Sequence, residues 1–168
     1  MSKLKVLIRV AICVAIQIVL ARFLAINTPV LRISFEFIPL ALVAMLYGPW
    51  WSLGAAVAAD LLRSLIFPVG GFFPGFTLSA ALTGLVFGAF LYPCRKDWRH
   101  ILAPVLISTL VINIGLGTWW LTFLLDKGFL VMLPGRVVKN VVMIPVEFLV
   151  IRWMASWAPR LREMHPGE

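Results

Sequence analysis

The stretch MLYGPWW, residues 45–51, decides how the apolar region around it is divided into helices. Residues 37–59 carry no charge, so they could form one membrane-spanning helix or two. Gly48-Pro49 disfavours helix continuation, and the aromatic residues beside it are of the kinds that collect at a membrane–water boundary. The sequence therefore predicts two helices, at about 34–48 and about 50–67, the first short enough to require tilt, partial burial or a thinned bilayer.

The overall composition is that of an integral membrane protein. Of 168 residues, 62% are hydrophobic and 13% are charged, whereas soluble domains are roughly half apolar and about a quarter charged. Because a spanning helix needs about 20 apolar residues, the chain has room for about six or seven spans and for no separate catalytic domain. The net charge of +8 could suggest nucleic acid, but the basic residues are scattered among apolar runs. Membrane topology explains them better, so we expect contact with lipid and no nucleic-acid partner.

Turn signals divide the rest of the chain into further spans. Asn27-Thr-Pro29, the prolines and glycines of 68–75, the charged segment 95–99 and Asp126-Lys-Gly128 interrupt the apolar runs. The expected fold is all-α, one domain over residues 1–168. Its six transmembrane helices are predicted at about 4–24, 34–48, 50–67, 76–92, 101–125 and 133–157.

The distribution of Lys and Arg tests this number of spans, because cytoplasmic flanks carry the excess of these residues. With six spans and a cytoplasmic N-terminus, nine of the 15 basic residues fall inside: Lys3, Lys5, Arg9, Arg95, Lys96, Arg99, Arg152, Arg160 and Arg162. A single span over 37–59 would place the 95–99 cluster outside, against the rule. We therefore expect both termini in the cytoplasm.

Six basic residues remain on the outer half: Arg22, Arg32, Arg63, Lys127, Arg136 and Lys139. An ionisable residue inside a span costs about 2.5–3.5 kcal/mol on insertion scales, so such residues tend to face a polar interior and to be functional. The acids counted on the same side are three, Glu36, Asp60 and Asp126, too few to neutralise six bases. The imbalance predicts a pocket that opens outward and has spare positive charge for an anionic ligand.

The segment LPGRVVKN, residues 133–140, places two of these cations at the start of the last predicted span. Arg136, Lys139 and Asn140 are spaced i, i+3 and i+4, which puts them on one helical face. A helix N-terminus adds free N–H groups and partial positive charge that favour a carboxylate or phosphate. By spacing alone, anion binding and snorkelling of the two cations to lipid headgroups both stay open.

Asp60 and Arg63 are also spaced i, i+3. They could form an internal ion pair, or Asp60 could accept hydrogen bonds from the donors of a ligand ring. Tryptophans on the outer half serve either as membrane-boundary residues or as stacking surfaces. The further candidates with aromatic or polar side chains are Phe76, Thr77, Asn113, Trp119 and Trp120.

Small residues recur at four-residue intervals, and such faces let helices approach closely in a membrane. Ala80, Gly84 and Gly88 are expected to pack internally, whereas Ala11 and Ala15 could instead dock another membrane protein. No catalytic triad, phosphate loop, carboxylate pair or set of metal ligands is recognisable at the spacing that such chemistry needs. We expect no cofactor and no metal.

Five stretches resemble the folate family of substrate-binding S subunits of bacterial energy-coupling-factor (ECF) vitamin transporters. They are LARFLAINTPVLRISFEFIPLAL (20–42), MLYGPWW (45–51), FPGFTLSAALTG (73–84), NIGLGTWWL (113–121) and LPGRVVKN (133–140). Two departures affect the details of the pocket: Gly135 stands where alanine is more usual, and two tryptophans stand at 119–120 where one aromatic residue is usual.

The resemblance implies a protein of the bacterial cell membrane, not an enzyme, that captures a vitamin outside and topples in the bilayer to deliver it inside. It implies a transmembrane coupling subunit (EcfT), on which Ala11 and Ala15 would dock, and two ATPase subunits (EcfA and EcfA′). For folate, Arg22, Arg136 and Lys139 would meet anionic or carbonyl groups, and Asp60 would read the pterin. The alternatives are an S subunit for another vitamin and a small intramembrane enzyme acting on an anionic headgroup.

Overall fold

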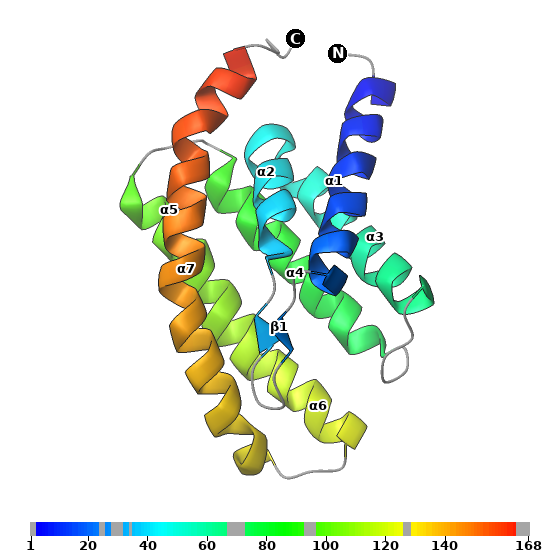
Figure 1. Ribbon diagram of the computed structural model, residues 1–168, viewed down its shortest axis with the longest axis vertical. Helices are drawn as coiled ribbons and strands as arrows, with labels where there is room; N and C mark the ends of the chain where they lie inside the picture. Colours follow the sequence, from blue (N-terminus) through cyan, green and yellow to red (C-terminus); the bar gives the residue numbers. More distant parts are fainter. Residues whose placement is uncertain are drawn as a thin grey trace.

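The computed structural model describes residues 3–23, 26–27, 32–33, 35–66, 73–92, 97–125 and 129–163, which form a bundle of helices with one very short sheet (Figure 1). The helices are α1 (Lys3–Phe23), α2 (Phe37–Tyr47), α3 (Pro49–Ile66), α4 (Pro74–Leu91), α5 (Trp98–Leu106), the π-helix η1 (Ile107–Leu116), α6 (Gly117–Leu125) and α7 (Phe129–Glu163). The first turn of α1 and the last turn of α7 lie at the same end of the bundle (Figure 1).

The break at Gly48 separates α2 from α3. Gly48 has a φ of 88°, a left-handed value that residues with a Cβ rarely adopt. Its N–H still donates to the carbonyl oxygen of Ala44 at 3.2 Å, which closes α2, and Pro49 opens α3 as the first residue of the new helix. The predicted break between two helices is therefore present at this glycine.

Helix α2 is short and surrounded by other helices. It has 11 residues and is therefore about 16 Å long, roughly half the hydrocarbon thickness of a bilayer. Ala41 and Ala44 are fully buried, and they belong to a core that also includes Phe87 of α4 and Ile151 of α7. Partial burial is thus how the protein accommodates this short apolar helix.

Helices α3 and α4 approach each other closely through small residues. A Cβ at Gly84 would stand 2.6 Å from the backbone oxygen of Ser52, and a side chain at Gly88 would collide with the backbone of Pro49. Two of the three small residues predicted to pack internally therefore do so against α3. The close contact fixes the relative position of two helices that both contribute to the pocket described below.

The segment between α1 and α2, expected to be a loop, contains a minimal antiparallel pair of strands, β1 (Ile26–Asn27) and β2 (Arg32–Ile33). Ile26 pairs with Ile33, and Asn27 pairs with Arg32. Thr28 and Pro29 of the predicted turn lie outside the described residues, and the two residues on each side of the gap form this ladder. In Figure 1 this sheet lies directly below α2, on the side of α2 away from the chain termini.

Helices α5, η1 and α6 follow one another without a gap and form one continuous helical segment from Trp98 to Leu125. Its middle third is π-helical, with turns wider than those of an α-helix. Helix α7 exceeds its predicted range at both ends, because it begins at Phe129 instead of 133 and ends at Glu163 instead of 157.

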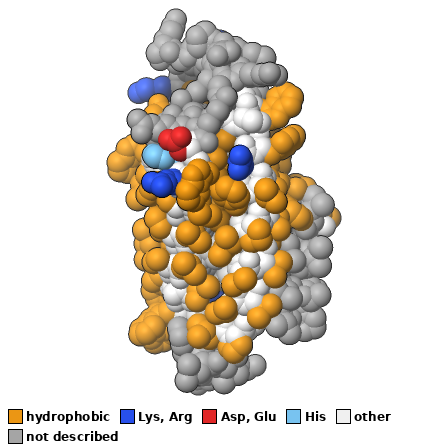
Figure 2. Space-filling view, turned by 90° about the vertical axis from the view of Figure 1, so that its left-hand side faces the viewer, with side chains coloured by type: hydrophobic (Ala, Val, Ile, Leu, Met, Phe, Trp, Pro, Cys, Tyr) orange, Lys and Arg blue, Asp and Glu red, His pale blue; other side chains and the backbone are white. Residues whose placement is uncertain are grey.

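The outside of the bundle is apolar over most of its surface. Figure 2 shows hydrophobic side chains covering one described face, with charged side chains gathered near the end that carries the termini. Four described helical segments are long and apolar enough to cross a membrane: Lys3–Phe23, Pro74–Leu91, Trp98–Trp120 and Leu133–Ala158. A soluble protein would bury such side chains, so this surface is suited to lipid.

Candidate ligand pocket

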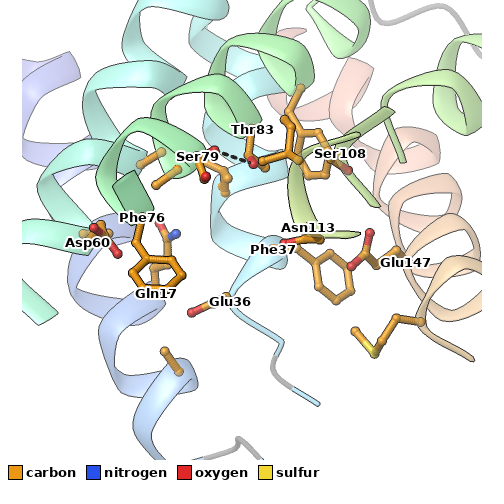
Figure 3. A pocket seen from close by; sticks show the side chains of 18 of the residues that line it. Gln17, Glu36, Phe37, Asp60, Phe76, Ser79, Thr83, Ser108, Asn113 and Glu147 are labelled. Carbon is orange, nitrogen blue, oxygen red and sulfur yellow. Dashed lines mark hydrogen bonds between the residues drawn. The ribbon is translucent and has the colours of Figure 1, made fainter. Parts of the chain in front are cut away.

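A pocket opens between α1, α2, α3, α4, η1 and α7 (Figure 3). Its wall combines apolar side chains with polar ones from α1, α3, α4, η1, α7 and the residue before α2. The polar lining residues are Gln17, Glu36, Asp60, Arg63, Ser79, Thr83, Ser108, Asn113, Lys139, Asn140 and Glu147. A concave site with aromatic walls and a few convergent polar groups is the usual form of a small-molecule site.

Asp60 stands at the centre of a network that joins three elements. Its side chain is only 6% exposed, and both oxygens accept hydrogen bonds: Oδ1 from Arg63 Nη2 at 2.6 Å and Oδ2 from Thr77 Oγ1 at 2.8 Å. Arg63 Nη1 also donates to Glu36 Oε2 at 3.1 Å, just before α2. The ion-pair interpretation of the Asp60–Arg63 spacing is therefore realised, and the network holds α3, α4 and the start of α2 together.

An aromatic group covers the α4 side of the pocket. Phe76 lines the pocket and packs edge-on against Phe73, with ring centroids 5.9 Å apart. Phe73 in turn packs against Trp120, whose Nε1 donates to Ser79 Oγ at 3.1 Å. Trp120 thus fixes a lining serine from behind, so it supports the wall without forming it.

The adjacent tryptophan has a different environment. Trp119 is 56% exposed and contacts Phe123 one turn further along, with centroids 5.9 Å apart. It does not belong to the pocket wall. The exposure of Trp119 fits the membrane-boundary interpretation, whereas Trp120 packs on Phe73 inside the bundle and lies outside the pocket wall.

Arg136 bonds to the π-helix and is not part of the pocket wall. Its Nη1 donates to the backbone oxygen of Asn113 at 3.0 Å and lies 3.5 Å from Oγ1 of Thr118, which is fully buried. The helical spacing correctly placed Arg136 near Lys139 and Asn140, yet only the latter two line the pocket. The guanidinium supports Asn113, a lining residue, through the main chain.

The predicted contact residues thus fall into three groups. Those in the pocket wall are Asp60, Phe76, Asn113, Lys139 and Asn140. Those that hold a wall residue by a hydrogen bond are Thr77, Trp120 and Arg136. Trp119 and Arg22 form the third group and do not line the pocket, although Ala21, next to Arg22 in the last turn of α1, does.

Glu147 is one of the polar wall residues that sequence reasoning missed, along with Gln17, Ser79, Thr83 and Ser108. It lies in the middle of α7 and reaches the pocket near Phe37 and Asn113 (Figure 3). The signal was present, because Glu147 is the only acid in the apolar run from 133 to 157. Counting acids on the outer half alone left Glu147 out, although it is the third carboxylate of the pocket wall beside Glu36 and Asp60.

Comparison with known proteins decides the family. Residues 5–154 match the family of ECF transporter substrate-specific components. The chain is 37% identical to the folate transporter FolT of Clostridium novyi (strain NT) over 98% of its own length and 96% of that protein. It is 34% identical to FolT of Leuconostoc mesenteroides subsp. mesenteroides over 82% of its length and 77% of that protein. The chain belongs to the ECF transporter S components.

Solved structures agree with this assignment. The crystal structure of FolT bound with folic acid matches this S component with a TM-score of 0.82 at 33% identity, covering 88% of this chain and 90% of that one. The S component for biotin matches with a TM-score of 0.70 at 20% identity, covering 96% and 92%. The second match shows the shared fold alone. The protein is thus a multi-pass membrane protein and a transporter subunit, not an enzyme.

Proposed function

We propose that this S component binds folate from outside the cell and delivers it inward. The single observation that carries the proposal is the pocket, which has cations, carboxylates, amides and an aromatic wall in one cavity. Folate needs all of these, because it combines a flat pterin rich in donors and acceptors with a glutamate tail that bears two carboxylates. The relatives named as folate transporters, similar over nearly the full length, support the same ligand.

In this proposal Lys139 attracts the glutamate tail, and Asn140 and Asn113 offer amides to the ligand. Phe76 gives the rings an apolar face. Asp60 keeps its place at the site, with its role divided between the ligand and the network of Arg63 and Thr77. Arg22 and Trp119 are omitted from the proposed contacts because the wall of the pocket does not include them.

Calorimetric titration of the purified protein tests the ligand. We expect tight binding of folate and none of biotin. Biotin is the control because the S component for biotin has the same fold, while biotin itself contains no pterin. The ultraviolet spectrum and mass of any small molecule that co-purifies give an independent identification. Absence of folate binding by the intact protein would overturn the proposal.

Substitution of Lys139 tests the proposed attraction between this cation and the glutamate tail of folate. Lys139→Ala is expected to weaken folate binding about tenfold or more, since a charge-assisted contact to a carboxylate is lost. Arg152→Ala is the matched control, because Arg152 is an exposed cation of the same helix outside the pocket wall. Equal losses in the two variants would show that only net charge matters.

We also propose the family's working arrangement for this chain: a six-span domain with both termini in the cytoplasm, one coupling subunit EcfT, and the ATPases EcfA and EcfA′. Ala11 and Ala15 are exposed on one side of α1 and present a smooth surface for a partner helix. Replacing both with tryptophan is expected to preserve folate binding and stop uptake in cells that supply the other subunits. Uptake that survives the replacement would remove this face from docking.

A further inference from the structure

Glu147 differs from every other carboxylate in the pocket wall in having no partner. Both oxygens of Asp60 accept hydrogen bonds, and Glu36 receives one from Arg63. Among the described residues, none donates a hydrogen bond to Glu147 or forms an ion pair with it. Lys139 attracts its charge and Glu36 repels it, but Lys139 lies two helical turns away, about 12 Å along the axis.

A partly buried carboxylate inside a membrane protein is costly unless donors reach it. Glu147 sits in an apolar setting, with Phe37 and Met143 beside it in the wall and Asn113 facing it from η1 (Figure 3). N–H or O–H groups in the cavity, from water or from a ligand, offset this cost. The wall therefore presents a carboxylate with free acceptor sites to a ligand that carries donors.

From this contrast we infer that Glu147 forms hydrogen bonds to the ligand's heterocycle and so determines specificity, a role that rests on the proposed binding of folate. The pyrimidinone edge of a pterin presents a ring N–H and an exocyclic amino group side by side. Two adjacent donors match the two oxygens of one carboxylate in a bidentate contact, which is among the strongest hydrogen-bonding arrangements in proteins. Asp60 is less suited to this contact, because each of its oxygens already accepts a hydrogen bond from Arg63 or Thr77.

The position of Glu147 also orients the ligand. Lys139 lies nearer the start of α7 and Arg63 nearer the end of α3, whereas Glu147 lies eight residues further along α7 than Lys139. Folate bound by its pterin at Glu147 directs its glutamate tail toward the two cations. Asn113, which faces Glu147 across the pocket, supplies an amide donor for the ring's carbonyl or nitrogen acceptors, whereas the Ser108 hydroxyl already donates to the Val105 carbonyl.

The test compares folate with 2-desaminofolate, in which hydrogen replaces the exocyclic amino group. Affinities are measured by calorimetry on the full chain in detergent. Wild-type protein is expected to prefer folate by about tenfold or more, since one charge-assisted hydrogen bond is lost in the analogue. Glu147→Gln is expected to lose about tenfold or more for folate and less than about threefold for the analogue, so that the preference collapses.

Two further variants separate recognition from folding. Glu147→Asp retains a carboxylate and is expected to keep the preference for folate, even where overall affinity falls. Glu36→Gln is the matched control, because Glu36 is a wall carboxylate that already accepts a hydrogen bond from Arg63. This variant is expected to lower the affinities for folate and for 2-desaminofolate by the same factor. Thermal unfolding without ligand verifies that each variant is folded.

The outcomes distinguish the two proposals. Equal losses for both ligands in Glu147→Gln, or no loss in either, would overturn the role of Glu147 and leave folate binding intact. A wild-type protein that binds neither ligand would overturn the proposed function, and the inference would fall with it.

Discussion

Asp60 and Glu147 line one pocket, carry the same charged group and have opposite surroundings. Asp60 receives hydrogen bonds from Arg63 and Thr77, while Glu147 receives none from the described residues. A carboxylate that accepts hydrogen bonds from the protein holds helices in place, and one that accepts none has free acceptor sites for a ligand. The comparison teaches that proximity to a pocket is a weaker sign of ligand contact than an unmet hydrogen-bonding requirement.

Removing the satisfied carboxylate should have the largest effect on stability. Asp60→Ala leaves the Thr77 hydroxyl without its acceptor and Arg63 with only Glu36, and should lower the free energy of unfolding by about 3 kcal/mol. Thermal unfolding in detergent measures the loss. The affinities for folate and for 2-desaminofolate should fall by the same factor, because the substitution changes the shape of the pocket. A selective loss for folate would assign the pterin to Asp60 and break the comparison.

The cations of α7 extend the comparison to positive charge. Arg136 is held by the π-helix, and Arg136→Ala leaves the oxygen of Asn113 and the buried hydroxyl of Thr118 short of a donor. We expect a loss of about 2 kcal/mol in unfolding free energy, partly restored in Arg136→Lys. Lys139→Ala, measured in the same way, should change stability less and folate affinity more. The reverse ranking would make Arg136 the anion-binding residue.

Removing the unsatisfied carboxylate should have a smaller effect of the opposite sign. Glu147→Gln replaces a charge that has no donor with a neutral amide, so the ligand-free protein should gain on the order of 1 kcal/mol in unfolding free energy. Thermal unfolding without folate measures the gain. Addition of saturating folate should stabilise the wild type more than the variant. A destabilised ligand-free variant would show that Glu147 has a structural partner after all.

The smallest effect is expected at Trp120. Trp120→Phe retains the ring that packs on Phe73 and removes only the hydrogen bond to Ser79. We expect a loss of about 1 kcal/mol or less and a modest decrease in folate affinity. Trp119→Phe is the control, because Trp119 is exposed and outside the pocket wall. A larger affinity loss at Trp119 would mean that the boundary tryptophan contacts the ligand.

Much of this fold can be predicted from the sequence. The apolar runs and the breaker at Gly48-Pro49 are local signals, and local signals decide where helices begin and end. The i, i+3 spacing of Asp60 and Arg63 is likewise local, and it predicted their ion pair as one of two interpretations.

The remaining features depend on contacts between helices, which spacing does not contain. Arg136 and Lys139 share a face by helical geometry. The Arg136 guanidinium nevertheless donates to the neighbouring π-helix, while Lys139 lines the pocket. The π-helix shifts the register of its residues relative to an ideal α-helix, so an α-periodic reading of 107–116 assigns faces incorrectly. Glu147 needed only its sequence context, because a lone acid within a span is itself a functional signal.

The shortness of α2 has a consequence for how the binding site is made. Phe37, its first residue, and Glu36, the residue before it, line the pocket, so the cavity begins where this half-length helix does. A helix extended before Phe37 on the same axis would enter the space beside this cavity. The shortness of α2 thus leaves room between its neighbours, and the folate that we propose as the ligand would occupy that room in place of further helical turns.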